Sequence, residues 1–321
     1  MICRICGNEA GNRTYRMREI MMGLDEHFEY FECAACGCLQ IAQIPEDMAR
    51  YYPPEYYSLA PVDCAPDRRL RRLHWTPLAR RILPTRTLAR LRILVDYRNL
   101  LGLRLRPDSR ILDVGCGSGG LICRLHSAGF PRVLGLDPFL PEDVTHPTGV
   151  RVLRRDLLDF SEGVGTWDVV MFQHSFEHIA EPQATLCRAA ELLAPGGTCL
   201  IAIPTASSYA WEHYRESWVQ IDAPRHFFLH TRRSMSLLAQ RAGLTIVEEL
   251  QESTNFQFWG SEQVRAGIPL HHPDSYYVNP SRSRFTPAQM REWQRQARRL
   301  NRRGRGDTVT YYLVGAGGKR R

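Results

Sequence analysis

The chain has 321 residues, of which 44% are hydrophobic and 10% aromatic, and it carries a formal net charge of +8. This length and composition predict a globular protein and exclude an intrinsically disordered one. The sequence holds no apolar run of about 18 residues, so no transmembrane helix is predicted. The opening MICRICGNEAG lacks the apolar core of a secretion signal. Ten cysteines without such a signal favour a reducing, cytoplasmic setting, in which cysteines remain thiols or bind metal.

Two Cys-x-x-Cys pairs stand near the start of the chain, Cys3 with Cys6 and Cys33 with Cys36. A glycine follows each pair, where a tight turn exposes backbone amides to thiolate sulfur. Four thiolates suit one closed, tetrahedral, structural zinc site. The alternative is four ordinary buried cysteines. Residues 1–60 are therefore predicted to be a zinc-binding module followed by a Tyr- and Pro-rich connector.

The next stretch, residues 61–107, is predicted to be a basic helical segment. Twelve arginines and a single acid lie between Arg68 and Arg106. Such a stretch suits nucleic acid, a phosphorylated substrate or peripheral contact with an anionic membrane. The alternative is a solvated helical face whose arginine stems cover apolar surface.

Residues 108–253 alternate between the apolar runs of strands and the periodicity of helices. Strands are predicted at 110–115, 132–137, 150–159, 167–173, 198–204 and 244–250, with helices at 119–128, 181–194 and 234–242. This alternation predicts an α/β fold with a parallel sheet and helices on both faces. Residues 254–306 then form an insertion or cap, and residues 307–321 supply a last strand and a basic tail.

The segment ILDVGCGSGGLICRL, residues 111–125, predicts a strand, a tight glycine turn and a helix. Gly115, Gly117 and Gly120 fit the dinucleotide pattern G-x-G-x-x-G, whereas Asp113 and the glycines at 115, 117 and 119 fit D-x-G-x-G-x-G. Asp137 ends the second strand, where an acid can accept hydrogen bonds from ribose hydroxyls. The glycine segment alone therefore leaves both NAD and S-adenosylmethionine (SAM) open.

Two later segments separate these cofactors. WDVVMFQHSFEHI (167–179) and ELLAPGGTCLIAIP (191–204), with a strand after the sixth, resemble class I SAM-dependent methyltransferases. The resemblance implies a Rossmann-like, seven-stranded sheet. With the cysteine module it extends to bacterial polysaccharide, deoxysugar and natural-product methyltransferases. It implies that SAM is bound by Asp113, Gly115, Gly117, Asp137, Asp156, Leu157, Gln173 and His174.

Three histidines are candidates for taking up the acceptor's proton. The loop QIDAPRHFFLH (220–230) resembles the loop of deoxysugar C-methyltransferases whose histidine is regarded as the base, and His226 is the matching position. The alternative is a loop histidine that hydrogen-bonds backbone. His174 and His178 follow the fourth strand, in a segment that resembles the H-E-x-x-H metal motif only loosely, with its acid misplaced. Arg225 and His230 are substrate candidates.

These observations predict methyl transfer from SAM to a small molecule, most simply a hydroxyl of a sugar or glycan precursor or natural product. C-methylation of a nucleotide-linked deoxysugar is the nearest variant. A different class is an RNA or DNA methyltransferase, which the segment FQHSFEH disfavours because many base methylases carry N/D-P-P-Y/F there. A third class is a non-catalytic, zinc-containing binding protein, which the intact glycine segment and Asp137 disfavour.

Overall fold

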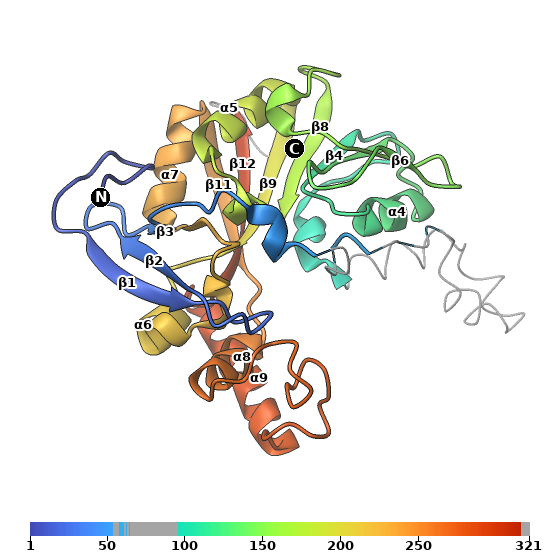
Figure 1. Cartoon of the computed structure of the whole chain (residues 1–321). Coiled ribbons are helices and arrows are strands. Elements are labelled where there is room, and N and C mark those ends of the chain that lie inside the picture. Colours follow the sequence, from blue (N-terminus) through green and yellow to red (C-terminus); the bar gives the residue numbers. More distant parts are fainter. Residues whose placement is uncertain (54–57, 61, 63, 65–95, 316–321) are drawn as a thin grey trace, which may run out of the picture.

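The computed structural model describes residues 1–53, 58–60, 62, 64 and 96–315. Most of the predicted basic helical segment lies outside these residues. The nucleic-acid and membrane alternatives rest largely on that segment, and they stay predictions. The described chain forms two sheets, a four-stranded one near the N-terminus and an eight-stranded one at the centre of the molecule (Figure 1). Within the described residues, no helix combines the length and apolar character needed to cross a membrane.

The central sheet has the order β11-β12-β9-β8-β4-β5-β7-β6. Its strands are β4 (Ile111–Val114), β5 (Val133–Leu136), β6 (Val144–Thr145), β7 (Arg151–Leu153), β8 (Trp167–Gln173), β9 (Leu193–Pro204), β11 (Leu244–Gln251) and β12 (Thr308–Gly315). Neighbours among β7, β5, β4, β8 and β9 pair in parallel, and β12 runs antiparallel to both β9 and β11. The seven predicted strands are present, and the short edge strand β6 is an eighth.

Helices cover both faces of this sheet, because alternate side chains along each strand point to opposite sides. Met171 belongs to one buried cluster with Ile122 of α4 (Gly120–Ser127). Its neighbour Val170 belongs to the other, with Leu186 of α5 (Pro182–Leu192) and Met235 of α7 (Arg232–Arg241). The prediction of a sheet layered between helices is therefore confirmed.

The predicted insertion contains two helices, α8 (Phe256–Arg265) and α9 (Pro287–Arg302), which extend from one end of the molecule (Figure 1). They share a small apolar cluster of their own around Trp259 and Met290. A further short helix, α6 (Tyr209–Tyr214), follows β9. The 3-10 helices are η1 (Met48–Tyr51), η2 (Arg98–Gly102), η3 (Leu157–Asp159), η4 (Phe176–His178), η5 (Arg215–Ser217) and η6 (Val219–Ile221).

The N-terminal module is fused to the central domain through the loop 220–230. Its strands β1 (Arg13–Arg18), β2 (His27–Glu32) and β3 (Leu39–Ile41) continue into β10 (Phe228–Leu229), which pairs antiparallel with β3. The Tyr30 hydroxyl also donates to the His226 carbonyl over 2.9 Å. The loop that carries the expected base His226 therefore serves as the docking strand for the module.

Candidate active site

A cavity of about 1110 Å³ opens at the carboxyl ends of β4, β5 and β8. In parallel α/β sheets this edge is where ligands bind. Every predicted cofactor residue except Gly117 lines the cavity. It continues past His174 to side chains of α9 and the segment after β11, namely Glu252, Gln294, Arg298 and Asn301. The space therefore has a glycine-loop end and a second, largely polar end.

The glycine loop leads from β4 into α4, and hydrogen bonds hold it against the end of β5. Gly115 has φ +71°, and a Cβ there would overlap the side chain of Ser175, so only glycine fits without rearrangement. The Gly115 amide donates to the Leu136 carbonyl over 2.7 Å, and the Gly117 amide donates to Oδ2 of Asp137 over 2.8 Å. The Phe139 amide binds the other Asp137 oxygen at 2.9 Å. The Asp137 carboxylate is thereby fixed at the cavity wall.

Asp113 places a second acid beside Asp137 in the same wall. Burial, and then the neighbouring Asp137, raise the pKa of Asp113 to about 8. Its Oδ1 has no hydrogen-bond partner among the described residues. Buried acceptors of this kind suit a ligand that brings hydroxyl or ammonium donors, and SAM carries both. The residues present therefore fit that cofactor.

Asn99 is a site residue that the sequence reading missed. Its Nδ2 donates to Oε1 of Gln173 over 3.0 Å, and both side chains line the cavity. Asn99 Oδ1 and Gln173 Nε2 have no hydrogen-bond partner within the described chain. A buried donor and acceptor left in this way suit a polar ligand group. Asn99 lies in the basic segment 61–107, whose arginines are its conspicuous feature and do not mark this asparagine as a ligand residue.

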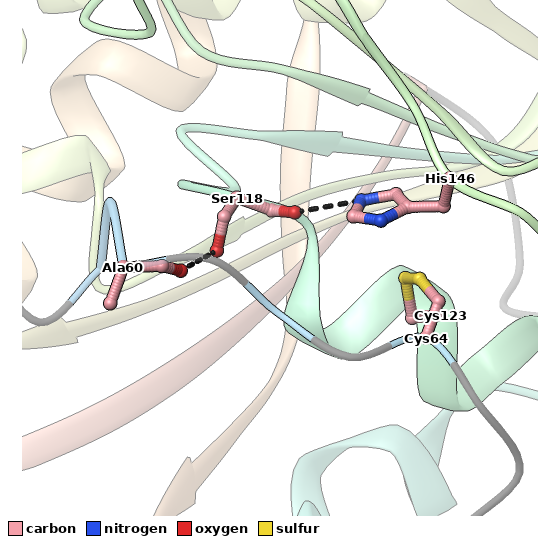
Figure 2. Close-up of a disulfide and its surroundings, with 5 residues drawn as sticks. All are labelled: Ala60, Cys64, Ser118, Cys123 and His146. Atoms are coloured by element: carbon pink, nitrogen blue, oxygen red, sulfur yellow. Dashed lines mark hydrogen bonds between the residues drawn. A yellow bond between two sulfur atoms is a disulfide. The ribbon is translucent and has the colours of Figure 1, made fainter.

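A connector segment lies directly on the glycine loop (Figure 2). The Ser118 amide donates to the Ser58 carbonyl over 2.9 Å, and the Ser118 hydroxyl donates to the Ala60 carbonyl over 2.7 Å. A disulfide joins Cys64 to Cys123 of α4, with the Cα atoms 5.2 Å apart. Both cysteines were expected to be thiols, so the disulfide corrects that prediction and shows how this segment is fastened to the core.

His174 is the most accessible of the predicted catalytic histidines. It follows β8 with φ +54°, lines the cavity, and leaves 51% of its side chain exposed. Its Nδ1 lies 3.7 Å from Oε1 of the buried Glu177. The partial burial of this half-exposed ring would lower the pKa of His174, but the Glu177 carboxylate outweighs it and raises that pKa. Conversely, burial alone would raise the pKa of Glu177, but His174, His178 and His226 lower it.

His226 lies one layer behind the cavity. It is not among the lining residues, and only 9% of its side chain is exposed. Its ring meets His178 edge to face with centroids 4.7 Å apart. His178 does line the cavity, and burial, then His226, lower the pKa of His178 to about 4. His226 is therefore set back from the cavity that His174 and His178 line.

Arg225 and His230 are both buried and make contacts within the protein interior. Nη2 of Arg225 lies 2.9 Å from Glu19 of the N-terminal module and 2.6 Å from Asp222, with all three residues buried. The carboxylates hold this arginine where the module docks. His230 stacks on Phe228, and burial lowers its pKa to about 3. Neither side chain lines the cavity, so the expected substrate roles have no support in their placement.

The four predicted zinc ligands converge. One sulfur from each of Cys3, Cys6, Cys33 and Cys36 lies within 4.8 Å of all the others. The Cys3–Cys36 and Cys6–Cys33 sulfur pairs are 3.6 and 3.5 Å apart. A tetrahedral zinc with bonds of about 2.3 Å places its sulfurs about 3.8 Å apart, so the cluster fits that ion closely.

Comparison with known proteins identifies the family. Residues 86–249, just over half of the chain, match a methyltransferase domain family. The chain belongs to this family, and its Rossmann-like mixed sheet is that of class I SAM-dependent methyltransferases.

Curated relatives include the ubiquinone biosynthesis O-methyltransferase of Maricaulis maris, 31% identical over 40% of this chain and 55% of that protein. The corresponding Caulobacter sp. protein is 35% identical over 29% of this chain and 40% of that protein. The chain thus spans about half the length of these relatives. The EEF1A lysine methyltransferase 4 of Mus musculus is 26% identical over 53% of this chain and 82% of that protein.

Solved structures with a similar fold include a geranyl diphosphate methyltransferase in complex with SAM. It is 15% identical, with a TM-score of 0.45, over 72% of this chain and 88% of that one. The geranyl diphosphate C-methyltransferase of Streptomyces coelicolor, in complex with S-adenosyl-L-homocysteine, is 16% identical with a TM-score of 0.43. That match covers 72% of this chain and 79% of the other.

Proposed function

We propose that this protein transfers a methyl group from SAM to a hydroxyl of a small-molecule acceptor. The observation that carries the proposal is that His174 lines the cavity and directly follows β8. In the sheet this strand lies between β4, which leads into the glycine loop, and β11, which leads to Glu252. A cofactor on the glycine loop and an acceptor beyond it would meet at this imidazole. The name of the ubiquinone O-methyltransferase relatives supports an oxygen acceptor.

We assign each proposed cofactor residue to one part of SAM. Asp137 accepts hydrogen bonds from the ribose hydroxyls, and Asp156 and Leu157 border the adenine. Asp113, Gly115 and Gln173 border the methionyl part, to which we add Asn99. The side chain of Asp156 also accepts from the Leu158 amide over 2.8 Å, which caps η3 and fixes its place at the rim.

His174 is proposed as the general base. SAM supplies an electrophilic methyl group on a sulfonium sulfur. With Nδ1–H directed at Glu177, the lone pair on Nε2 of His174 takes the proton of the acceptor hydroxyl. The oxygen–methyl bond forms as the sulfur–methyl bond breaks, and the proton stays on His174. The rest of the rate enhancement comes from positioning the acceptor, because its oxygen must lie in line with the methyl group and the sulfur.

The acceptor is proposed to be a sugar or glycan precursor. The second end of the cavity supports this class, since Glu252, Gln294 and Asn301 offer both acceptors and donors to a molecule rich in hydroxyls. C-methylation of a nucleotide-linked deoxysugar remains the nearest variant, and the cysteine module favours it through the family resemblance.

A structural zinc ion held by Cys3, Cys6, Cys33 and Cys36 completes the proposal. The sulfur distances support it, and so does the Nε2 group of Gln40, which donates to Cys3 sulfur over 3.1 Å. Such a partner stabilises a metal-bound thiolate. A closed site of four thiolates leaves no open position, so the ion would hold the docked module rather than act on substrate.

The test is methyl transfer from isotope-labelled SAM to a panel of nucleotide sugars, free glycans and phenols. The proposal expects label on the oxygen of at least one sugar, together with demethylated cofactor. Label on carbon would favour the deoxysugar variant. Binding of SAM without transfer to any sugar, but with transfer to a phenol, would overturn the proposed acceptor class.

A further inference from the structure

A second cluster of metal-ligand side chains lies at the wall of the cavity. Glu177, His178 and His226 each offer a ligand atom, and these atoms all lie within 4.8 Å of one another. The first two belong to η4, and the third comes from the loop before β10. The cluster shares no residue with the cysteine site. Glu177 and His178 belong to the segment that resembles the H-E-x-x-H metal motif only loosely. The third ligand, His226, lies far along the chain, so a local motif could not include it.

Both histidines are held in one tautomer. Nδ1 of His178 lies 2.9 Å from the Arg225 carbonyl and 3.1 Å from the Tyr52 hydroxyl, which can accept from the same N–H, and Nδ1 of His226 lies 2.7 Å from the Gln220 carbonyl. A carbonyl oxygen only accepts, so each Nδ1 carries the hydrogen. In each neutral ring, Nε2 is left with the lone pair. Metal-binding histidines are oriented in this way, with the second nitrogen donating to a backbone carbonyl.

Glu177 gives the cluster a buried negative charge. The residue has no exposed surface, and neither carboxylate oxygen has a hydrogen-bond partner within the described chain. Its Oε1 lies 4.0 Å from Nε2 of His226 and 3.7 Å from Nδ1 of His174. Among the described residues, Asp222 also faces the cluster, 3.8 Å from Nε2 of His226. A buried carboxylate beside imidazole lone pairs is costly unless a cation lies among them.

We propose that Glu177, His178 and His226 bind a divalent transition-metal ion. Ligand bonds of about 2.1 Å place neighbouring ligand atoms about 3.0–4.2 Å apart, so the cluster needs only a small contraction. Imidazole with one carboxylate favours zinc, iron, cobalt or nickel over magnesium or calcium. Three protein ligands leave a coordination position open. Since His178 lines the cavity, the ion would lie at the cavity wall. The inference does not depend on methyl transfer.

The alternative occupant is a proton. His226 protonated on both nitrogens would direct Nε2–H between Asp222 and Glu177, at 3.8 and 4.0 Å. A proton would neutralise the cluster without any metal. The experiment must therefore count metal ions and must separate this site from the cysteine site.

Cobalt separates the two sites, because thiolate ligands give an intense charge-transfer band that nitrogen and oxygen ligands do not. The full chain would be stripped with a chelator, titrated with Co²⁺ and dialysed, and the bound cobalt counted. The proposal expects two ions per wild-type chain, one with the thiolate band. Glu177→Gln and His226→Gln should each bind one ion and keep that band. His174→Gln, which alters the adjacent histidine outside the cluster, should bind two.

A single cobalt with the thiolate band in the wild-type chain would overturn the inference in favour of the proton. Two ions retained by both Glu177→Gln and His226→Gln would also overturn it. If neither variant folds, the wild-type count and spectrum still decide, because a second ion without thiolate character requires ligands other than the cysteines. If the wild-type chain binds two ions but transfers no methyl group to any acceptor, the proposed function is refuted and the metal site is still supported.

Discussion

The backbone amide of Gly117 donates a hydrogen bond to Oδ2 of Asp137 over 2.8 Å. This bond ties the loop after β4 to the end of β5 and orients the carboxylate before any ligand arrives. Because the Phe139 amide holds the other oxygen at 2.9 Å, the acid cannot turn away from the cavity wall without losing a partner. The relationship explains why an acid and a glycine twenty positions apart act as one unit.

Replacing Asp137 should weaken SAM binding. Asp137→Ala removes the acceptor proposed for the ribose hydroxyls and the anchor of the glycine loop. We expect the dissociation constant for SAM to rise by about tenfold to a hundredfold, since hydrogen bonds to a charged group are worth about 1.5–3 kcal/mol. Isothermal titration calorimetry measures it, with the exposed Asp159→Ala as control. Equal affinities for the two variants would refute the role of Asp137.

Gly115 and Gly149 form a matched pair for the shape of the glycine loop. Both have positive φ, +71° and +83°, but a Cβ on Gly115 would overlap Ser175, whereas nothing lies within 4 Å of a Cβ on Gly149. Gly115→Ala should therefore lower the free energy of unfolding by about 1–3 kcal/mol more than Gly149→Ala does. Urea unfolding provides the comparison. Losses of equal size would mean that the close approach to Ser175 is not limiting.

The base assignment separates His174 from His226. His174→Gln should reduce kcat by about a hundredfold or more, a larger change than it causes in SAM affinity. His226 lies behind the cavity wall, so His226→Gln should reduce kcat less than His174→Gln does. Steady-state kinetics with the acceptor found in the panel would measure both, and calorimetry would check SAM binding. A larger loss in kcat for His226→Gln than for His174→Gln would return the base to the loop histidine.

Asp113 makes stability depend on pH. Burial raises its folded-state pKa from 3.8 to about 8, so the native protein keeps a proton that the unfolded chain releases. Its contribution is therefore present below about pH 4 and is lost as the pH rises toward about 8. Asp113→Asn stays neutral throughout, so its free energy of unfolding should exceed that of wild type by at least about 1 kcal/mol near pH 8.

Urea unfolding at about pH 4, 6 and 8 tests this sign, and the gap between the two proteins should close at the acidic end. A gap that does not change with pH, or an asparagine variant that is less stable near pH 8, would contradict the raised pKa. The same variant should bind SAM less tightly, because the wild-type acid is proposed to border the methionyl part.

The strands of the central sheet were predictable because each is a short apolar run ended by a turn. The prediction for 167–173 coincides with β8, and the glycine loop was recognised from its spacing. The predicted strand 150–159 is shorter, since Asp156 caps η3 and ends the extended chain. The local sequence pattern was sufficient to predict a strand or turn wherever the residues that define it are contiguous in the chain.

Contacts between distant segments were not predictable in the same way. Arg225 meets Glu19 across 206 positions, and nothing in DAPRH announces an ion pair with the N-terminal module. The ion pair of Arg225 with Glu19 and the pairing of β10 with β3 hold this loop against the N-terminal module. His226 therefore lies behind the cavity rather than in it. The cluster of Glu177, His178 and His226 was missed for the same reason, because one of its three members comes from a separate element.

Calorimetric titration of the full chain with SAM, and in parallel with NAD, decides which cofactor the glycine loop binds. We expect saturable binding of one SAM per chain and no binding of NAD. Saturable binding of NAD without binding of SAM would contradict it and would assign the glycine loop to a dinucleotide.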